Sequence, residues 1–265
     1  IMSSPAVSKV QKKDKKFLLI VVAASFLVAA MFGSRNSLSL TIEGIDQSQT
    51  LNYLQISFAF ALGQLVVGAI SPFAGMIADK YGSGKTLTVG ILLGLLGIIL
   101  IPYSTTTFTL SISLGVISSI GLGVAGLPVV LASVNRLIPQ NKVGMAFGLV
   151  NAGQSLGQLI LAPLAGFIIV NFGWILCILF LCTVLLLVLP FSFILRSRTD
   201  RKQPSGVQTK SLSETLRIAF NTPSYIYLVV GFFVCGFHVA FIATHMPGVI
   251  PVSYTHLTLP TTLQV

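Results

Sequence analysis

Seven long runs of hydrophobic residues follow one another along the chain, with polar segments between them. The runs cover residues 17–41, 51–78, 86–103, 109–134, 143–170, 174–195 and 224–248. A helix needs roughly 20 apolar residues to cross the hydrocarbon core of a bilayer, and each run is long enough to do so. The pattern therefore predicts seven membrane-spanning α-helices. Their glycines and prolines agree with this prediction, because both residues are commoner in membrane helices than in soluble ones.

The spacing of the runs divides the predicted helices into six and one. Connections among the first six are short, whereas a long polar and basic segment precedes the seventh. We expect a tail at residues 1–16, a six-helix bundle at 17–195, a linker at 196–222 and one helix of a second unit at 223–250. Residues 251–265 lack a helical period, which favours a non-native extension of a gene truncated after its seventh helix. A natural unstructured tail is the alternative.

The composition excludes a soluble globular domain. Hydrophobic residues make up 54% of the chain and charged residues only 8%. A soluble domain carries about 25% charged residues, because its surface faces water. The chain is therefore predicted to be an integral membrane protein.

The basic residues predict the orientation of the helices. If the N-terminus lies in the cytoplasm and the helices alternate, every one of the 16 Lys and Arg residues except Arg35 falls on the cytoplasmic side. The first outer loop instead carries Glu43 and Asp46. This is the asymmetry of the positive-inside rule, so we expect a multi-pass protein of the cell (inner) membrane with a cytoplasmic N-terminus. The net charge of +10 then reflects topology and contact with the lipid bilayer, and no nucleic acid partner is needed to explain it.

One short segment raises the question of nucleotide binding. Residues 82–86 read Gly-Ser-Gly-Lys-Thr, like the end of a phosphate-binding loop. The first glycine of such a loop would stand at position 79, which is occupied by Asp79, whose negative charge repels phosphate. A predicted membrane helix precedes the segment, where a phosphate loop requires a strand. We therefore expect no nucleotide.

The same segment fits a different signature. The stretch "GMIADKYGSGK" resembles the loop between the second and third helices of the Major Facilitator Superfamily, on the strength of Gly75, Asp79, Lys80, Gly82 and Lys85. The family pattern usually has a basic residue where this chain has Gly84. The resemblance implies a conformational latch in which ion pairs, with Arg136 among the partners of Asp79, hold one of two states. The alternative is a helix end decorated with ordinary interfacial charges. Gly82 is expected to adopt a positive φ, and Gly75 to allow close helix approach.

Further stretches carry the same resemblance. They are "GSRNSLSLTI", "NRLIPQNKVGMAFGLVNAGQSLGQLILAPLAG" and "GFFVCGFHVAFIATHMPGVI", which are similar to the branch of oxalate:formate antiporters and monocarboxylate porters. The resemblance covers nearly all of residues 17–250. It implies an all-α membrane protein with two six-helix bundles, of which this chain holds the first and one helix of the second. It also implies alternating-access transport of a small mono- or dicarboxylate, by antiport or proton symport, without cofactors.

Arg35 is the basic residue that lies within a predicted span. It stands eight residues before Glu43 and therefore about 12 Å inside the outer boundary. A charge at such depth costs about 2.5–3.5 kcal/mol on insertion scales, and a guanidinium is well shaped to hold a carboxylate. Arg35 is therefore predicted to bind substrate or to gate. The alternative is pairing with Glu43 or Asp46, or extension of the side chain toward the outer surface.

Polar residues in other predicted helices extend this candidate site. Those that either complete a substrate cavity or form interhelical hydrogen bonds are Asn36, Gln64, Asn151, Gln154 and Gln158. His238 and His245 in the seventh helix are candidates for proton coupling, with structural hydrogen bonding as the alternative. The sequence shows neither a nucleophile–base pair nor a cluster of metal ligands, so we predict that the protein is not an enzyme and has no metal site.

Small residues predict where helices touch. Gly144 and Gly148, then Gly153 and Gly157, are each four positions apart, a spacing that lets backbones approach in a membrane. Such contacts serve either sliding surfaces or static packing. Pro128 predicts a bend in the fourth helix.

Two other functions fit seven or more membrane helices. One is a drug or sugar exporter on the same fold. The other is a seven-helix receptor, which the loop charges oppose because such receptors place the N-terminus outside, and no lysine lies in the seventh helix to hold retinal.

Overall fold

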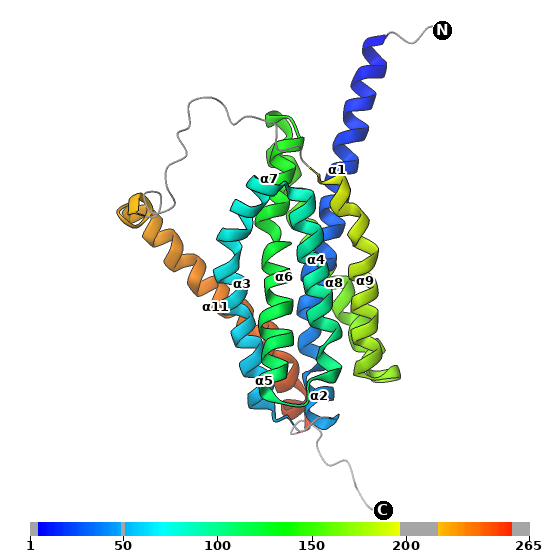
Figure 1. Cartoon of the computed structure of the whole chain (residues 1–265), viewed down its shortest axis with the longest axis vertical. Helices are drawn as coiled ribbons and strands as arrows, with labels where there is room; N and C mark the ends of the chain where they lie inside the picture. Colours follow the sequence, from blue (N-terminus) through cyan, green and yellow to red (C-terminus); the bar gives the residue numbers. More distant parts are fainter. Residues whose placement is uncertain (1–4, 49–50, 197–216, 256–265) are drawn as a thin grey trace, which may run out of the picture. The chain divides into compact units, whose positions relative to one another are not determined.

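The computed structural model describes the backbone of residues 5–48, 51–196 and 217–255, and the side chains of residues 15–46, 51–196 and 217–242. Throughout these residues the regular elements are helices (Figure 1). The chain divides into two compact units, Ile1–Thr199 and Asp200–Val265. Each unit is described separately.

The first unit is a bundle of six membrane-length segments. Its elements, in chain order, are α1 (Pro5–Leu38), η1 (Ser39–Thr41), α2 (Ile42–Ser48), α3 (Tyr53–Tyr81), α4 (Ser83–Ile99), η2 (Ile101–Tyr103), α5 (Thr107–Leu110), η3 (Ser111–Ser118), α6 (Ser119–Val124), α7 (Leu127–Leu137), η4 (Gln140–Lys142), α8 (Val143–Phe172) and α9 (Trp174–Ile194). The second unit contains α11 (Pro223–Thr255).

The seven predicted spans are confirmed. Within the described residues, seven helical segments are long and apolar enough to cross a membrane: Lys15–Asp46, Tyr53–Tyr81, Ser83–Tyr103, Thr107–Leu137, Gln140–Phe172, Trp174–Ile194 and Pro223–Ile242. Each overlaps one hydrophobic run of the sequence. The last helix, α11, continues to Thr255, five residues beyond the predicted end at residue 250.

The fourth span is not one continuous α-helix. It begins as α5, widens into the π-helix η3, returns to α-helix in α6 and stops at Ala125 and Gly126 before α7 begins. Pro128 lies in the first turn of α7, where the N–H that proline lacks has no intrahelical partner anyway. The predicted bend at Pro128 is therefore a break that lies two residues earlier.

Two tight turns of the bundle share one sequence pattern, which the sequence analysis missed. Residues 72–82 read PFAGMIADKYG and residues 163–173 read PLAGFIIVNFG, an offset of 91 positions (173 − 82). Both segments end a long helix on a glycine with positive φ, 91° at Gly82 and 86° at Gly173. In each, the glycine N–H donates to the carbonyl four residues earlier at 3.0 Å. The second and fifth spans therefore end in the same way.

Glycine determines how closely α1 and α8 approach. A Cβ atom added at Gly153 would lie 2.6 Å from Cβ of Ser25, and one at Gly157 would overlap the backbone of Ala29. In a membrane the hydrophobic effect does not drive helices together, so such backbone contacts supply much of the packing energy. The predicted close contact is thus present at this pair of glycines. At Gly144 and Gly148 an added Cβ would meet no atom of the described residues within 4 Å, so the predicted close contact is not found there among these residues.

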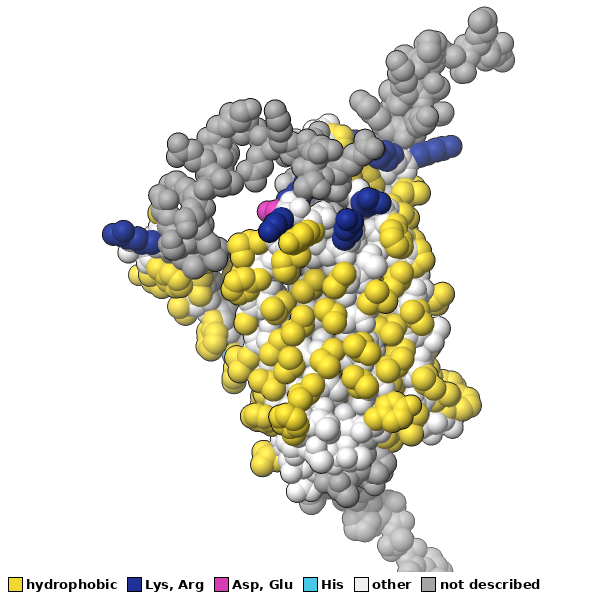
Figure 2. Space-filling model, in the orientation of Figure 1, with side chains coloured by type: hydrophobic (Ala, Val, Ile, Leu, Met, Phe, Trp, Pro, Cys, Tyr) yellow, Lys and Arg dark blue, Asp and Glu magenta, His cyan; other side chains and the backbone are white. Residues whose placement is uncertain are grey.

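The surface of the first unit has a broad apolar zone and a basic end (Figure 2). The element order brings the start of α1, the α3–α4 turn, the end of α7, the start of α8 and the end of α9 to the same end of the bundle. We call this the basic end; it carries Lys15, Lys16, Lys80, Lys85, Arg136, Lys142 and Arg196. The acidic residues Glu43 and Asp46 follow the opposite end of α1. The folded bundle thus has the charge asymmetry of a multi-pass membrane protein.

Candidate functional site

Arg35 and Gln64 meet within the membrane-spanning part of the bundle. Arg35 lies in the last turn of α1, and its Nη2 donates a hydrogen bond to Oε1 of Gln64 on α3. The two helices run in opposite directions, so the end of α1 and the first half of α3 lie at the same depth. The structure therefore joins two of the residues that the sequence singled out independently.

The hydrogen bond from Arg35 goes to a neutral partner. Arg35 forms no ion pair with any residue that the structure describes, so the predicted alternative of pairing with Glu43 or Asp46 is not found there. A guanidinium has five N–H donors, and one of them is used by Gln64. A hydrogen bond to a charged group contributes about 1.5–3 kcal/mol, similar in size to the 2.5–3.5 kcal/mol that the buried charge costs on insertion scales. The positive charge itself remains uncompensated by these residues.

A small cavity adjoins Arg35. It has a volume of about 60 Å³ and is enclosed by the second half of α1, by α3 and by the break between α6 and α7. Arg35 and Ser71 are its polar lining residues, and the hydroxyl of Ser71 donates to the carbonyl of Val67 at 2.7 Å. The break between α6 and α7 therefore borders the space next to the guanidinium, with Gly126, Leu127 and Pro128 among the lining residues.

The other predicted polar residues are not joined to this pair. Asn36 is half-buried, and its carbonyl accepts a hydrogen bond from Ser39. Asn151 donates to the carbonyl of Phe147 on its own helix at 2.9 Å. Gln154 and Gln158 are half-buried on α8, and Oε1 of Gln154 is buried without a hydrogen-bond partner among the described residues.

Buried serines near Arg35 escaped the sequence analysis. Ser34 and Ser37 are fully buried on α1, and neither hydroxyl has a hydrogen-bond partner in the described part of the chain. A serine in a helix usually satisfies its hydroxyl with the carbonyl four residues earlier, as Ser71 does. The pattern Ser-Arg-Asn-Ser is the sequence signal that could have revealed this cluster, since four successive polar residues are unusual within a span.

The histidines belong to the second unit. Nδ1 of His238 lies 2.8 Å from the carbonyl oxygen of Val234 one turn earlier, and the side chain is exposed on α11. This is the structural hydrogen bond that the sequence left open as an alternative. His245 lies on the backbone of α11 but outside the described side chains.

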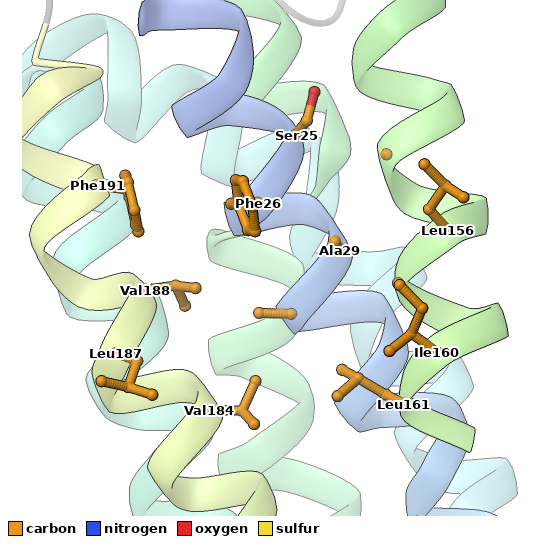
Figure 3. Close-up of a pocket in the computed structure, with 13 residues that line it drawn as sticks. Ser25, Phe26, Ala29, Leu156, Ile160, Leu161, Val184, Leu187, Val188 and Phe191 are labelled. Carbon is orange, nitrogen blue, oxygen red and sulfur yellow. The ribbon is translucent and has the colours of Figure 1, made fainter. Parts of the chain in front are cut away.

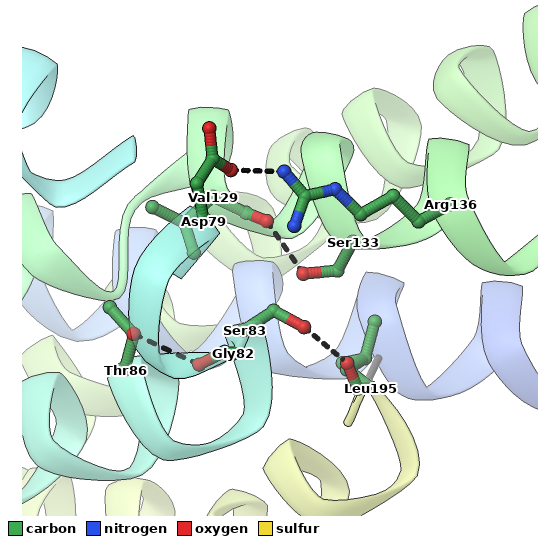
Figure 4. Close-up of polar contacts among 8 residues, drawn as sticks. All are labelled: Asp79, Gly82, Ser83, Thr86, Val129, Ser133, Arg136 and Leu195. Atoms are coloured by element: carbon green, nitrogen blue, oxygen red, sulfur yellow. Dashed lines mark hydrogen bonds and ion pairs between the residues drawn. The ribbon is translucent and has the colours of Figure 1, made fainter. Parts of the chain in front are cut away.

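An ion pair connects two helix ends at the basic end. Asp79, three residues before the turn at Gly82, pairs with Nη2 of Arg136 in the last turn of α7 (Figure 4). The side chains remain 54% and 32% exposed, respectively. Exposed pairs contribute about 0–1 kcal/mol, so this contact biases an arrangement of the two helices without locking it.

The turn between α3 and α4 is also tied to α9. Ser83 Oγ donates to the carbonyl of Leu195 at 2.8 Å, and Thr88 and Ser192 share a hydrogen bond of 2.7 Å one turn deeper (Figure 4 draws the first of these). A Cβ added at Gly84 would lie 2.8 Å from Cβ of Arg196. This gives a steric reason for the departure from the family pattern, because a long basic side chain at position 84 would collide with the end of α9.

The remaining residues of the α3–α4 signature make few contacts with other helices. Lys80 places Nζ 5.2 Å from the ring centre of Tyr81, and Lys85 is exposed on the first turn of α4. A Cβ added at Gly75 would meet no atom of the described part of the chain within 4 Å, so the close helix approach expected at this glycine is not found there. Gly82 has the positive φ that was predicted.

The Gly-Ser-Gly-Lys-Thr segment does not form a phosphate loop here. Gly82 caps α3, and α4 begins at the next residue, Ser83. The hydroxyl of Thr86 donates to the carbonyl of Gly82 at 3.0 Å, and the hydroxyl of Ser83 donates to the carbonyl of Leu195. A helix therefore precedes the segment where a phosphate loop has a strand.

The chain is similar in sequence to known membrane transporters. Monocarboxylate transporter 11 of Mus musculus is 27% identical over 178 residues, which are 67% of this chain and 39% of that protein. The riboflavin transporter RibZ of Clostridioides difficile is 28% identical over 162 residues, or 61% of this chain and 35% of RibZ. The chain thus spans about two fifths or less of the length of these curated relatives. Both relatives are transporters, which agrees with the prediction that the chain is not an enzyme.

Solved structures share the fold. The POT family transporter PepTSo superposes with a TM-score of 0.56 over 88% of this chain and 52% of its own, at 14% sequence identity. An auto-inhibited POT family peptide transporter gives a TM-score of 0.57 over 89% of this chain and 50% of its own, at 16% identity. The sequence model of the Major Facilitator Superfamily matches residues 19–264. This chain therefore belongs to the Major Facilitator Superfamily.

Proposed function

We propose that the protein is a secondary active transporter that moves a small organic anion, a mono- or dicarboxylate, across the membrane by alternating access. Arg35 binds the carboxylate and Gln64 holds the guanidinium in place. Antiport against a second anion or symport with a proton supplies the driving force. Members of this superfamily place the substrate between two helix bundles near the middle of the bilayer, and Arg35 stands on the first of these bundles.

The observation that carries the proposal is the uncompensated charge of Arg35. The residue lies within a span, forms no ion pair among the described residues and borders a cavity of about 60 Å³. A charged side chain in a span normally faces a polar cavity and has a partner there. A carboxylate would supply that partner and would accept paired hydrogen bonds from the guanidinium fork. The similarity to a monocarboxylate transporter supports the same class of substrate.

The basic end supports the conformational part of the proposal. The Asp79–Arg136 pair joins α3 to α7, and the Ser83–Leu195 hydrogen bond joins the α3–α4 turn to α9. We infer that these contacts favour one of two states of the bundle and loosen in the other, since a contact shifts an equilibrium only if it differs between the states. We further infer that the basic end faces the cytoplasm of the cell, in keeping with the positive-inside rule.

Residues assigned only from sequence remain part of the proposal. Asn36, Gln154 and Gln158 are proposed to widen the polar surface around the substrate, and the buried, unpartnered Oε1 of Gln154 supports such a role on α8. His238 and His245 are proposed as proton carriers. Lys80 and Lys85 are proposed to supplement the charge of the latch.

The transport proposal is tested with membrane vesicles from cells that express the protein from its natural gene. Radiolabelled lactate, oxalate, glucose and riboflavin are offered separately, with and without a proton gradient or unlabelled counter-substrate inside. We expect saturable uptake of a carboxylate, stimulated either by internal anion or by external acid. Vesicles that take up none of the four, or only the neutral solutes, would contradict the proposal.

A second candidate is export of a larger solute on the same scaffold. The similarity to the riboflavin transporter RibZ favours it, since it is as strong as that to the monocarboxylate transporters. Riboflavin or glucose transport in the same assay, insensitive to the charge at position 35, would establish this function in place of anion transport.

A further inference from the structure

An apolar cavity lies between α1, α8 and α9 (Figure 3). Its volume is about 520 Å³, and its walls are formed by side chains such as Phe26, Leu156, Ile160, Leu187 and Phe191. Ser25 is its polar lining residue, and the hydroxyl of Ser25 donates to the carbonyl of Leu149 at 3.3 Å. With that hydroxyl engaged, the cavity offers a ligand almost purely hydrocarbon contacts.

The packing of the three helices explains the cavity. The α1 and α8 helices touch through the backbones of Ala29 and Gly157, whereas α1 and α9 are separated by the stacked rings of Phe26 and Phe191, whose centres are 6.0 Å apart. One neighbour of α1 is therefore close and the other is held away by the width of side chains. The hollow that results is open on one side, where Leu187 is 68% exposed.

Each of the three helices has a cation at the basic end. Lys16 lies on α1, Lys142 immediately precedes α8, and Arg196 follows α9 by two residues. Nζ of Lys142 lies 5.1 Å from the ring centre of Phe17, so the start of α8 lies next to α1 at this level. These three side chains, which we call the cationic rim, all belong to the basic end of the bundle.

The distance between the cationic rim and the cavity lies within one leaflet of a bilayer. At 1.5 Å per residue, Arg196 lies roughly 8 Å along the axis from Phe191, and Lys16 lies roughly 15 Å from Phe26. One leaflet contributes about 15 Å to the hydrocarbon core. Leu18, Leu19 and Val22 are exposed on α1 between the rim and the cavity, so an apolar path connects the two. A hydrocarbon chain whose headgroup rests on the rim would reach the cavity with its terminal half.

We propose that the α1–α8–α9 cavity binds an acyl chain of an anionic phospholipid whose phosphate is held by Lys16, Lys142 and Arg196. Basic pockets between membrane helices suit anionic headgroups, and an acyl chain suits a hollow lined by aliphatic and aromatic side chains. Charge selects this occupant over a transmembrane helix of a second copy, because a helix brings no phosphate to the three cations of the rim. The site is separate from Arg35 and does not depend on the transport proposal.

Native mass spectrometry of the full chain in detergent tests the site. Phosphatidylglycerol and phosphatidylcholine with identical acyl chains are titrated in parallel. We expect one phosphatidylglycerol to bind in preference to phosphatidylcholine. Leu187→Trp fills the hollow and should lower phosphatidylglycerol binding at least about tenfold. The matched control is Leu186→Trp at the preceding residue of α9. Leu186 is 51% exposed and does not line the cavity, so this variant should bind phosphatidylglycerol normally.

Charge variants test the headgroup contact. Lys16→Gln, Lys142→Gln and Arg196→Gln should each weaken phosphatidylglycerol binding about fivefold and leave phosphatidylcholine unchanged. Lys85→Gln removes a cation from α4, which does not line the cavity, and should have no such effect. Equal binding of the two lipids, or equal effects of the two tryptophans, would overturn the proposal. So would a dimer that Leu187→Trp dissociates without changing the lipid count, since a second copy would then occupy the cavity.

Discussion

Arg35 near the end of α1 donates a hydrogen bond to Gln64 in the first half of α3, and the two residues come from antiparallel helices at one depth. The amide orients the guanidinium but leaves its charge in place. Side-chain entropy is expensive to remove from a long arginine, so a partner that fixes the fork in advance makes subsequent anion binding more favourable. Gln64 is therefore a positioning residue, and Arg35 is the residue that contacts the substrate in the proposed transporter.

Replacing Arg35 by Gln removes the charge and retains an amide. We expect at least a 100-fold loss in the kcat/KM of carboxylate uptake, because two charge-assisted hydrogen bonds of about 1.5 kcal/mol or more are lost. Arg35→Lys keeps the charge without the fork and should retain part of the activity. Uptake into vesicles, normalised to the inserted protein, measures both variants. Normal kinetics in Arg35→Gln would show that the substrate does not depend on this charge.

Because Asp79 and Arg136 form an ion pair at the basic end, replacing either residue should change the transport rate by a small and non-additive amount. Asp79→Asn and Arg136→Gln should each change the transport rate by up to about fivefold, the size expected for an exposed pair. The double variant should be no more affected than either single variant, and the exchange of Asp79→Arg with Arg136→Asp should recover the rate. Additive effects without recovery would mean that the two residues are ordinary interfacial charges, the alternative that the sequence left open.

The contact between α1 and α8 predicts a difference between two glycines of one helix. Gly157→Val forces a side chain into the backbone of Ala29, and overpacking of this kind typically costs about 1–3 kcal/mol. Gly148→Val places the same side chain at a position where an added Cβ meets none of the described atoms within 4 Å. Thermal unfolding in detergent should show a lower midpoint for the first variant and little change for the second. Equal midpoints would mean that the close contact contributes nothing to stability.

The turn at Gly82 predicts a backbone effect. Its φ of 91° and ψ of 141° lie in a region that residues other than glycine rarely enter, so Gly82→Ala should destabilise the bundle by about 1–3 kcal/mol. The control is Gly166→Ala in the interior of α8, where an added Cβ meets nothing within 4 Å and alanine favours the helix. In the same thermal unfolding assay, Gly82→Ala should lower the unfolding midpoint and Gly166→Ala should raise it slightly. A neutral Gly82→Ala would show that the turn relaxes without strain.

The number of spans and their approximate limits could be read from the sequence, because lipid requires every spanning helix to be long and apolar. The ion pair between Asp79 and Arg136 was also within reach, since both residues end helices at the basic end. The π-helical stretch Ser111–Ser118 was not, because no residue type marks a change from four-residue to five-residue hydrogen bonding. The break at Gly126 was placed two residues late for a similar reason: proline signals a disturbance, whereas packing decides where the helix ends.

The glycines show most clearly what sequence spacing leaves undetermined. Two pairs with the same spacing lie on α8, and within the described residues Gly153 and Gly157 touch a neighbouring helix whereas Gly144 and Gly148 do not. The pairs are nine residues apart, so at 3.6 residues per turn they lie on opposite faces of α8, and the four-residue spacing alone does not say which face a partner helix covers. The same holds for Gln64, the partner of Arg35. The sequence shows that Gln64 lies at the depth of Arg35, but not that it lies on the side of α3 that faces α1.

The two copies of the repeated segment, which end at Gly82 and at Gly173, have the same backbone turn but differ in charge. Both copies fold into the same glycine turn after the same proline, yet where the first has Asp79 and Lys80 the second has Val170 and Asn171. The scaffold thus contains a charged and an uncharged version of one corner. The uncharged turn at Gly173 shows that this turn forms without a carboxylate at the corresponding position. The role of Asp79 is therefore its ion pair with Arg136 and not the formation of the turn.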